Sequence, residues 1–399
     1  MTALTDIKEP VPLSTKAPPG FALWQLGFRP FFLLASGFAA LSVGLWALQF
    51  AGWLGQSYLK GPIWHAHEML FGFALAVIVG FLLTAGRNWS GRPTLTGKPL
   101  MALALLWVAG RVLVLTPLGW TAALVNAAFP LAAAIALAIP FISSGSRRNY
   151  FFVGVLALMS AAVLGVHLNQ LGVLPLSSWF SLQLALDALL FIMAVMGGRV
   201  IPLFTNSGVS GAKATRHPAV EKAALGGTLL LLAADVMQLN STLLMTIAFA
   251  CAVAHLIRWM LWQPWKTTGV PLVWVLHVAY LWIPVHLVLR GFSEMALVTP
   301  SLATHAFTVG AAGGLIIGMM TRTARGHTGR QLLADRWDTV CYLLILFAGL
   351  VRVLLPLVAP AHVVLAVLGS AMLWSGGFAL YFVRYWPVLT RARVDGKPG

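Results

Sequence analysis

Long apolar stretches are the feature that most constrains how this chain of 399 residues can fold. Hydrophobic residues make up 59% of the sequence and charged residues only 9%, whereas soluble domains carry about 25% charged residues. A membrane-crossing helix needs about 20 mainly apolar residues, and stretches of that length recur along the chain. They are longer than the strands of a membrane barrel, so we predict an all-α, polytopic membrane helical bundle.

Breaks rich in Pro, Gly and polar residues, such as Gly61-Pro62, divide these stretches into about twelve predicted transmembrane helices. The predicted spans are 28–51, 63–86, 97–116, 119–141, 150–172, 178–205, 219–238, 241–262, 270–291, 299–321, 337–358 and 361–386. We therefore predict a single transmembrane domain at 28–386, preceded by a segment at 1–27 and followed by a tail at 387–399.

The positive charges fall mainly in alternate loops between the predicted spans. Cytoplasmic loops of membrane proteins carry the excess of Lys and Arg, so both the 1–27 segment and the 387–399 tail are predicted to be cytoplasmic. The net charge of +16 does not indicate nucleic-acid binding, because the cations lie in short loops and not along a basic amphipathic helix. The partner that composition predicts is the lipid bilayer.

An internal repeat is indicated by the second and tenth predicted spans and the loops that follow them. Repetition of a helical unit would place one histidine of each span at the same depth, while chance recurrence of glycine is the alternative. The residues His67, Gly72, Gly80, Gly91 and Arg92 recur at identical spacing as His305, Gly310, Gly318, Gly329 and Arg330.

Several of the ten histidines are predicted to gather near the outer membrane face. Helix rise, about 1.5 Å per residue, places His277 near mid-membrane and five others in the outer half. A histidine inside a membrane is costly unless it has a partner, and a neutral imidazole is a common metal ligand. The alternative for any single histidine is a hydrogen bond to a neighbouring helix. The five outer histidines are His65, His67, His167, His286 and His305.

A haem explains such a gathering better than a lone zinc ion, because bis-histidine ligation needs one imidazole from each of two helices. We predict His67 and His305 as the ligand pair, with His65 and His277 as further candidate metal ligands. Cys251 and Cys341 lie in no CxxCH motif, so the haem would be a non-covalent haem b. Copper on the remaining imidazoles is a further prediction. Candidate cations for the haem propionates are Arg111, Arg290 and Arg352, with snorkelling to the interface as the alternative.

Other charged residues are embedded in the predicted spans or close to their inner ends. Asp187 is costly there without a partner, and it could pair with an arginine, orient a ligand histidine or carry a proton. The polar residues at the inner side could instead form a cytoplasmic anchor loop. The remaining candidates are Arg29, Glu68, Arg199, Arg322, His327 and Arg330.

Several motifs together resemble the NnrS family over nearly the whole chain. They are 26–32 (LGFRPFF), 64–72 (WHAHEMLFG), 198–202 (GRVIP), 274–277 (WVLH), 319–322 (MMTR) and 326–330 (GHTGR). The resemblance implies a bacterial inner-membrane protein that contains haem and copper and is tied to the nitric oxide response. It implies importance for Arg29, His65, His67, Glu68, Arg199, His277, His305, Arg322, His327 and Arg330. Neither His167 nor His286 falls in these motifs.

A looser likeness links the chain to the main subunit of haem-copper oxidases, which also has twelve spans and holds a haem between histidines of the second and tenth. This chain has no His-Pro-Glu-Val-Tyr stretch in its sixth predicted span and no double histidine in its tenth. Oxygen reduction at a dinuclear centre is therefore not predicted, since a shared fold is weak evidence for function.

Three functional hypotheses remain at this point. The first is a haem protein that mitigates nitrosative stress, with nitric oxide or a related small molecule and an unidentified electron donor as partners; whether it acts as an oxidoreductase stays open. The second is a transporter of a small molecule, metal or haem, because about twelve spans, repeats and embedded charges are also transporter features. The third is a haem sensor without turnover.

Overall fold

The structure, a computed structural model, describes residues 20–54 and 58–397, and helices form nearly all of its regular structure there. Each of the twelve predicted spans is a helix, which confirms the all-α bundle. The bounds are α1 Phe28–Phe50, α2 Gly61–His67, η1 Glu68–Ala74, α3 Leu75–Ser90, α4 Gly97–Leu113, α5 Gly119–Ser143, α6 Tyr150–Gln170, α7 Ser178–Gly208, α8 Pro218–Val236, α9 Ser241–Leu261, α10 Pro271–Glu294, α11 Pro300–His305, η4 Ala306–Gly313, α12 Gly314–His327, α13 Arg336–Val358 and α14 Val363–Thr390.

Within the described ranges, 10 helical segments are long and apolar enough to cross a membrane. The other two predicted spans are α4, which has only 17 residues, and α8, which carries Glu221, Lys222 and Asp235 within its 19 residues. Both lie alongside longer helices, since α4 packs on α5 and α8 packs between α7 and α9. The predicted segments 1–27 and 387–399 are described only from Gly20 and up to Lys397, and α14 extends to Thr390.

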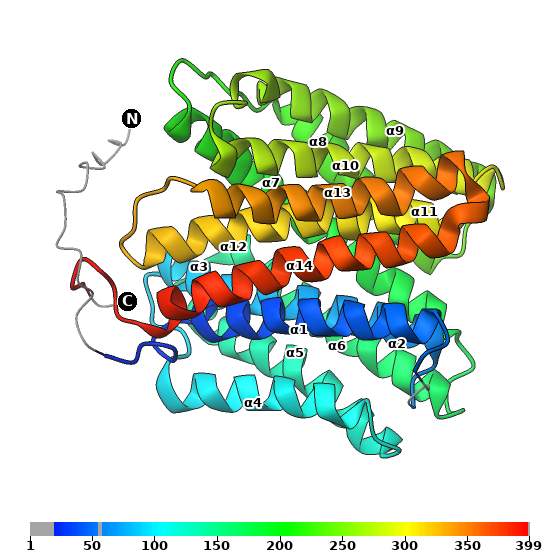
Figure 1. The fold of residues 1–399 in the computed structure, drawn as a ribbon, viewed down its shortest axis with the longest axis horizontal. Coiled ribbons are helices and arrows are strands. Elements are labelled where there is room, and N and C mark those ends of the chain that lie inside the picture. Colours follow the sequence, from blue (N-terminus) through cyan, green and yellow to red (C-terminus); the bar gives the residue numbers. More distant parts are fainter. Residues whose placement is uncertain (1–19, 55–57, 398–399) are drawn as a thin grey trace.

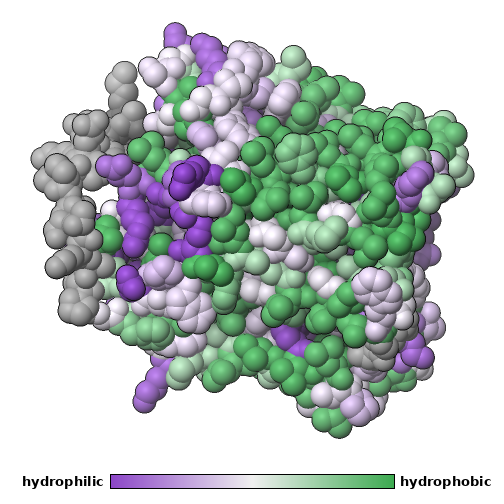
Figure 2. Space-filling view, in the orientation of Figure 1, coloured by the Kyte–Doolittle hydropathy of each residue, from purple (hydrophilic) through white to green (hydrophobic). Residues whose placement is uncertain are grey.

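The helices run side by side along the long axis of the molecule and alternate in direction (Figure 1). One end, where α1 begins and α3, α12 and α14 end, carries most arginines, and we call it the arginine-rich end. Figure 2 shows hydrophilic residues gathered there, while apolar side chains cover much of the helix surface between the two ends. Large apolar side chains such as Leu105, Ile139 and Val383 are exposed on these flanks, as expected for surfaces that face lipid.

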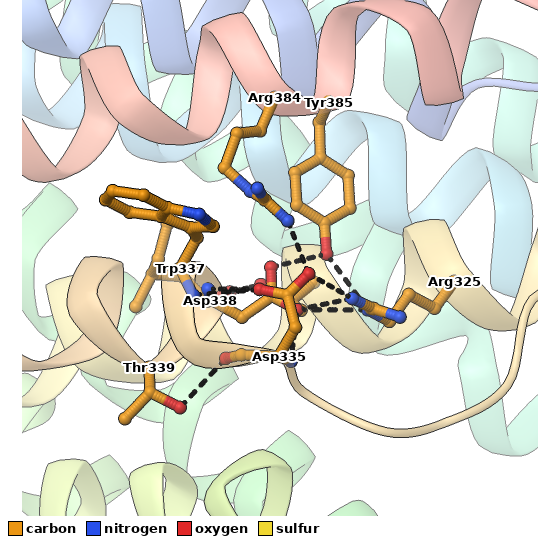
Figure 3. Close-up of polar contacts among 9 residues, drawn as sticks. Arg325, Asp335, Trp337, Asp338, Thr339, Arg384 and Tyr385 are labelled. Atoms are coloured by element: carbon orange, nitrogen blue, oxygen red, sulfur yellow. Dashed lines mark hydrogen bonds and ion pairs between the residues drawn. The ribbon is translucent and has the colours of Figure 1, made fainter.

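A polar cluster ties α12, α13 and α14 together at the arginine-rich end (Figure 3). Asp335 caps α13 by accepting from the backbone of Trp337 and Asp338, and the Asp338 side chain accepts in return from the Asp335 backbone. Asp338 also accepts from Arg325 at 2.6 Å and from the Tyr385 hydroxyl at 3.0 Å. Each buried acceptor therefore has a donor, which removes the cost of placing a carboxylate inside the bundle.

The predicted repeat is visible in the backbone. In both copies an α-helix ends at the histidine, a π-helical stretch follows, and an α-helix then resumes. The first copy is α2, η1 and α3, and the second is α11, η4 and α12. Both end at a glycine in the left-handed region, Gly91 with φ +64° and Gly329 with φ +75°, which a residue without a Cβ adopts easily. The recurrence of sequence thus corresponds to a recurrence of local structure.

The other repeated glycines allow helices to approach closely. A Cβ on Gly72 would lie 2.6 Å from the Phe38 ring, and one on Gly310 would lie 2.4 Å from the Trp282 ring. Added Cβ atoms on Gly80 and Gly318 would also come within 3.0 Å of neighbouring side chains. Small residues at such contacts let membrane helices pack backbone against side chain.

Replacing Gly310 by alanine is expected to lower the free energy of unfolding by about 1–3 kcal/mol, because the rigid, buried Trp282 ring cannot move away cheaply. Thermal unfolding of the purified protein measures this, with a thiol-reactive dye that reports exposure of the buried Cys251 and Cys341. Gly154 in α6 is the matched control, since its alanine would meet nothing within 4 Å. Equal stability of the two variants would show that the close approach is not required.

Candidate functional site

Four helices bring histidines to the end of the bundle opposite the arginine-rich end. His65 and His67 lie at the end of the short helix α2, and His305 ends α11. His167 lies in the last turn of α6, and His286 lies in the second half of α10. The alternating helix directions place all five towards one end of the bundle. Four of them form two imidazole pairs.

The first pair consists of His65 and His305, and both side chains are half-buried. Their rings are parallel to within 8° and their centroids are 6.2 Å apart. The ring of Trp46 stacks on His65 at 5.0 Å. His305 donates from Nδ1 to the Ser301 carbonyl oxygen at 2.7 Å, so its Nε2 carries the lone pair that a metal needs.

Arg352 is the cation next to this first pair. It donates to the Ser301 hydroxyl at 3.0 Å, one turn from His305, and it interacts electrostatically with both imidazoles. Among the described residues no carboxylate forms an ion pair with Arg352, so its charge remains available to an anionic group.

The second pair consists of His67 and His167, whose Nε2 atoms are 3.1 Å apart and fully buried. His67 donates from Nδ1 to Glu68 at 2.7 Å, and the same carboxylate oxygen accepts from Arg111 at 2.7 Å. The ring of Tyr58 lies parallel to His167 at 5.9 Å. In the described part of the chain, Nδ1 of His167 is buried without a hydrogen-bond partner. A carboxylate that orients a histidine in this way is typical of metal sites.

The guanidinium of Arg111 is held in place by this network. Besides Glu68 it binds the side-chain oxygen of Asn126, whose own amide donates to the Ala122 carbonyl at 2.8 Å. Arg111 also lies near the rings of Phe38 and Trp107. Its charge is therefore neutralised by Glu68, whereas the sequence suggests Arg111 as one of three candidate cations for the haem propionates.

Arg290 is likewise engaged by carboxylates. It binds Asp187 at 3.1 Å and Asp235 at 2.5 Å, and Gln183 donates to Asp187 at 2.9 Å. Of the three roles predicted for Asp187, pairing with an arginine is the one seen. A cavity of about 370 Å³ adjoins this ion pair, and its lining is Trp179, Phe180, Gln183, Leu184, Asp235, Val236 and Gln238.

The pairing of histidines differs from the predicted one. The prediction paired His67 with His305, whereas the structure gives His67 another neighbour, His167, and His305 another neighbour, His65. His277 joins neither pair, since its Nε2 donates to the Thr205 hydroxyl at 2.8 Å. Within residues 20–54 and 58–397, no group of three or more His, Cys, Asp or Glu side chains is arranged to hold a metal.

The remaining predicted residues lie at the arginine-rich end. Arg199 donates to Asn149 at 3.0 Å, and Arg322 stacks over the Phe204 ring at 3.6 Å. The side chains of Arg29 and Arg330 lie within electrostatic range of each other, and His327 interacts with Arg29. These residues are thus far along the helices from the imidazole pairs.

Sequence reasoning gave too little weight to His167 and missed Trp46, Tyr58 and Asn126. The depth of His167 at the end of its span was a usable signal, because it matches that of His67. No sequence pattern distinguishes Trp46, Tyr58 and Asn126 from other residues of the predicted spans and loops.

Comparison with known protein families gives one match. The family described as NnrS protein matches residues 22–393, which is nearly the whole chain. No curated protein matches the chain.

Proposed function

The chain belongs to the NnrS family, and on that premise we propose that it holds a haem b between His65 and His305. Membership supports a membrane protein of the nitric oxide response. The observation that carries the haem proposal is the pair of parallel, half-buried imidazoles contributed by two helices from distant parts of the sequence.

The centroids of this pair are 6.2 Å apart. Two metal–nitrogen bonds of about 2.0 Å and two ring radii of about 1.1 Å would span roughly 6 Å if both imidazoles turned their Nε2 atoms to one iron. A haem iron needs only two protein ligands, whereas a zinc site uses three or four. The residues present therefore suit a haem better than a lone zinc ion.

Three neighbours support the same proposal. The Ser301 carbonyl fixes the His305 tautomer, Trp46 gives an aromatic wall, and Arg352 offers a cation to a propionate. A bound haem would supply one-electron redox chemistry, with electrons from a separate donor. We place the arginine-rich end in the cytoplasm of a bacterium, by the positive-inside rule, so the haem would lie near the outer face of the inner membrane.

For copper, we propose the second imidazole pair, His67 and His167, as the ligands in preference to the first pair. A metal bound by both Nε2 atoms at about 2.0 Å would span their 3.1 Å separation at an angle of roughly 100°, close to tetrahedral. Glu68 would fix the tautomer and direction of His67, as carboxylates do behind metal-bound histidines. His67 and His167 thus take the place of the predicted set that included His277.

An optical spectrum and metal analysis of the purified full chain test the proposal. The expected result is a Soret band with bis-histidine features and about one iron per chain. Protein without chromophore or iron would refute the haem. If such protein moved a small anion, metal or haem into vesicles, the transporter hypothesis would replace ours.

A further inference from the structure

Arg29, in the first turn of α1, is buried with none of its surface exposed. Its Nη1 donates to two backbone carbonyls near the end of α14, those of Leu389 at 3.0 Å and Arg391 at 2.8 Å. Its Nε and Nη2 are buried and have no partner among the described residues. Two of the five N–H donors of this guanidinium are therefore satisfied, and no described carboxylate neutralises its charge.

The two unpartnered nitrogens lie on the same edge of the guanidinium. Their N–H bonds are parallel, and this is the edge that binds two oxygens of a carboxylate, phosphate or similar anion side by side. The backbone carbonyls of Leu389 and Arg391 hold the opposite side, so the free edge has a fixed direction. Arg29 therefore presents a preformed, bidentate hydrogen-bond donor inside the protein.

A second unpaired cation lies close by. Arg330, in the loop after α12, has a buried Nη1 without a partner in the described part of the chain, and its charge acts on Arg29. Arg393 is also near, but Asp395 binds it at 2.6 Å, and that hydrogen bond lowers the pKa of Asp395 to about 2. The Asp395 carboxylate is thus ionised and already engaged. Arg29 and Arg330 remain without a counter-charge.

An uncompensated buried cation is costly, and two close together also repel each other. In folded proteins such groups are paired or bind a ligand of opposite charge. No carboxylate in the described part of the chain fills this role, which leaves it open to an anion from solution.

We propose that Arg29 and Arg330 bind a small oxyanion at the arginine-rich end of the bundle. The ligand must present two oxygens on one edge, as nitrate, nitrite, formate and phosphate do, and the burial of Arg29 restricts its size. The site lies at the opposite end of the helices from the imidazole pairs, so it does not depend on the haem proposal. It assigns a ligand to two motifs, at 26–32 and 326–330, that the haem leaves unexplained.

Thermal unfolding of the purified full chain, followed through Cys251 and Cys341, tests the site. Nitrate, formate and phosphate are titrated separately against chloride at matched ionic strength. We expect at least one oxyanion to raise the melting temperature in a saturable way, because a ligand that binds only the folded state stabilises it. Chloride has no pair of oxygens and should have little effect.

Arg330→Gln is expected to weaken oxyanion binding, which raises the half-saturating oxyanion concentration at least tenfold. The matched control is Arg92→Gln, because Arg92 holds the equivalent place in the first repeat and is exposed; it should bind as the wild type does. Arg29→Lys keeps the positive charge but lacks the two parallel N–H donors of the guanidinium. This variant should therefore lose the preference for oxyanions over chloride. Equal effects of chloride and all oxyanions on the wild type, or equal binding by the Arg330 and Arg92 variants, would overturn the proposal. Should Arg29→Lys fail to fold, the Arg330 and Arg92 comparison decides.

Discussion

His65→Ala and His305→Ala are each expected to reduce haem occupancy at least tenfold, measured as Soret absorbance per chain in purified protein. Each substitution would remove one of the two protein bonds to the iron. His67→Ala and His167→Ala are expected to keep the haem, because the Nε2 atoms of those two histidines contact each other in the second pair.

The matched control is His362→Ala, since His362 is exposed at the same end of the bundle. It should leave both the spectrum and the iron content unchanged. Loss of haem in His67→Ala together with full occupancy in His65→Ala would restore the pairing predicted from the sequence. Full haem occupancy in both His65→Ala and His305→Ala would refute the proposal that this pair binds the haem.

Span positions were predictable because hydropathy is a local property of the chain. The repeat was predictable for a similar reason, since equal spacing of His67 and Gly72 and of His305 and Gly310 requires no knowledge of the fold. The depth of each histidine followed from helix rise alone. These arguments use only distance along a helix, so they hold without any information on how the helices pack.

The pairing of histidines was not predictable, because it depends on rotation about the helix axis. A π-helical stretch follows directly after His67 and after His305, and such stretches change the rotation per residue. The expected angle of about 200° between His65 and His67 did indicate that they face different partners. It could not indicate which partners, since His167 meets His67 only through the packing of α6 near α2.

Ion pairs were unpredictable for the same reason. Arg111 meets Glu68 and Arg290 meets Asp187 across 43 and 103 positions of the sequence, respectively. Nothing local distinguishes these arginines from Arg352, which has no carboxylate partner in the described part of the chain. Yet this difference decides which cation can serve an external anion, because carboxylates of the bundle already accept from the guanidinium groups of Arg111 and Arg290.

The second large effect is expected at Arg290. Replacing it by glutamine should lower the free energy of unfolding by about 3–5 kcal/mol, because Asp187 and Asp235 would then face each other without a cation. Asp187 is 2% exposed, so water cannot take over from the guanidinium. Denaturant or thermal unfolding of the purified protein measures the loss.

A double-mutant cycle shows whether charge is the cause. Asp187→Asn in the Arg290→Gln background removes one of the two carboxylates left without a cation. We expect this change to recover at least about 1 kcal/mol of the free energy of unfolding. The same Asp187→Asn change in the wild type should instead be destabilising, because it weakens the ion pair with Arg290. The sign of the effect thus reverses with the background if the ion pair stabilises α7, α8 and α10 together. An Asp187→Asn effect of equal sign and size in both backgrounds would mean that Arg290 acts through packing alone.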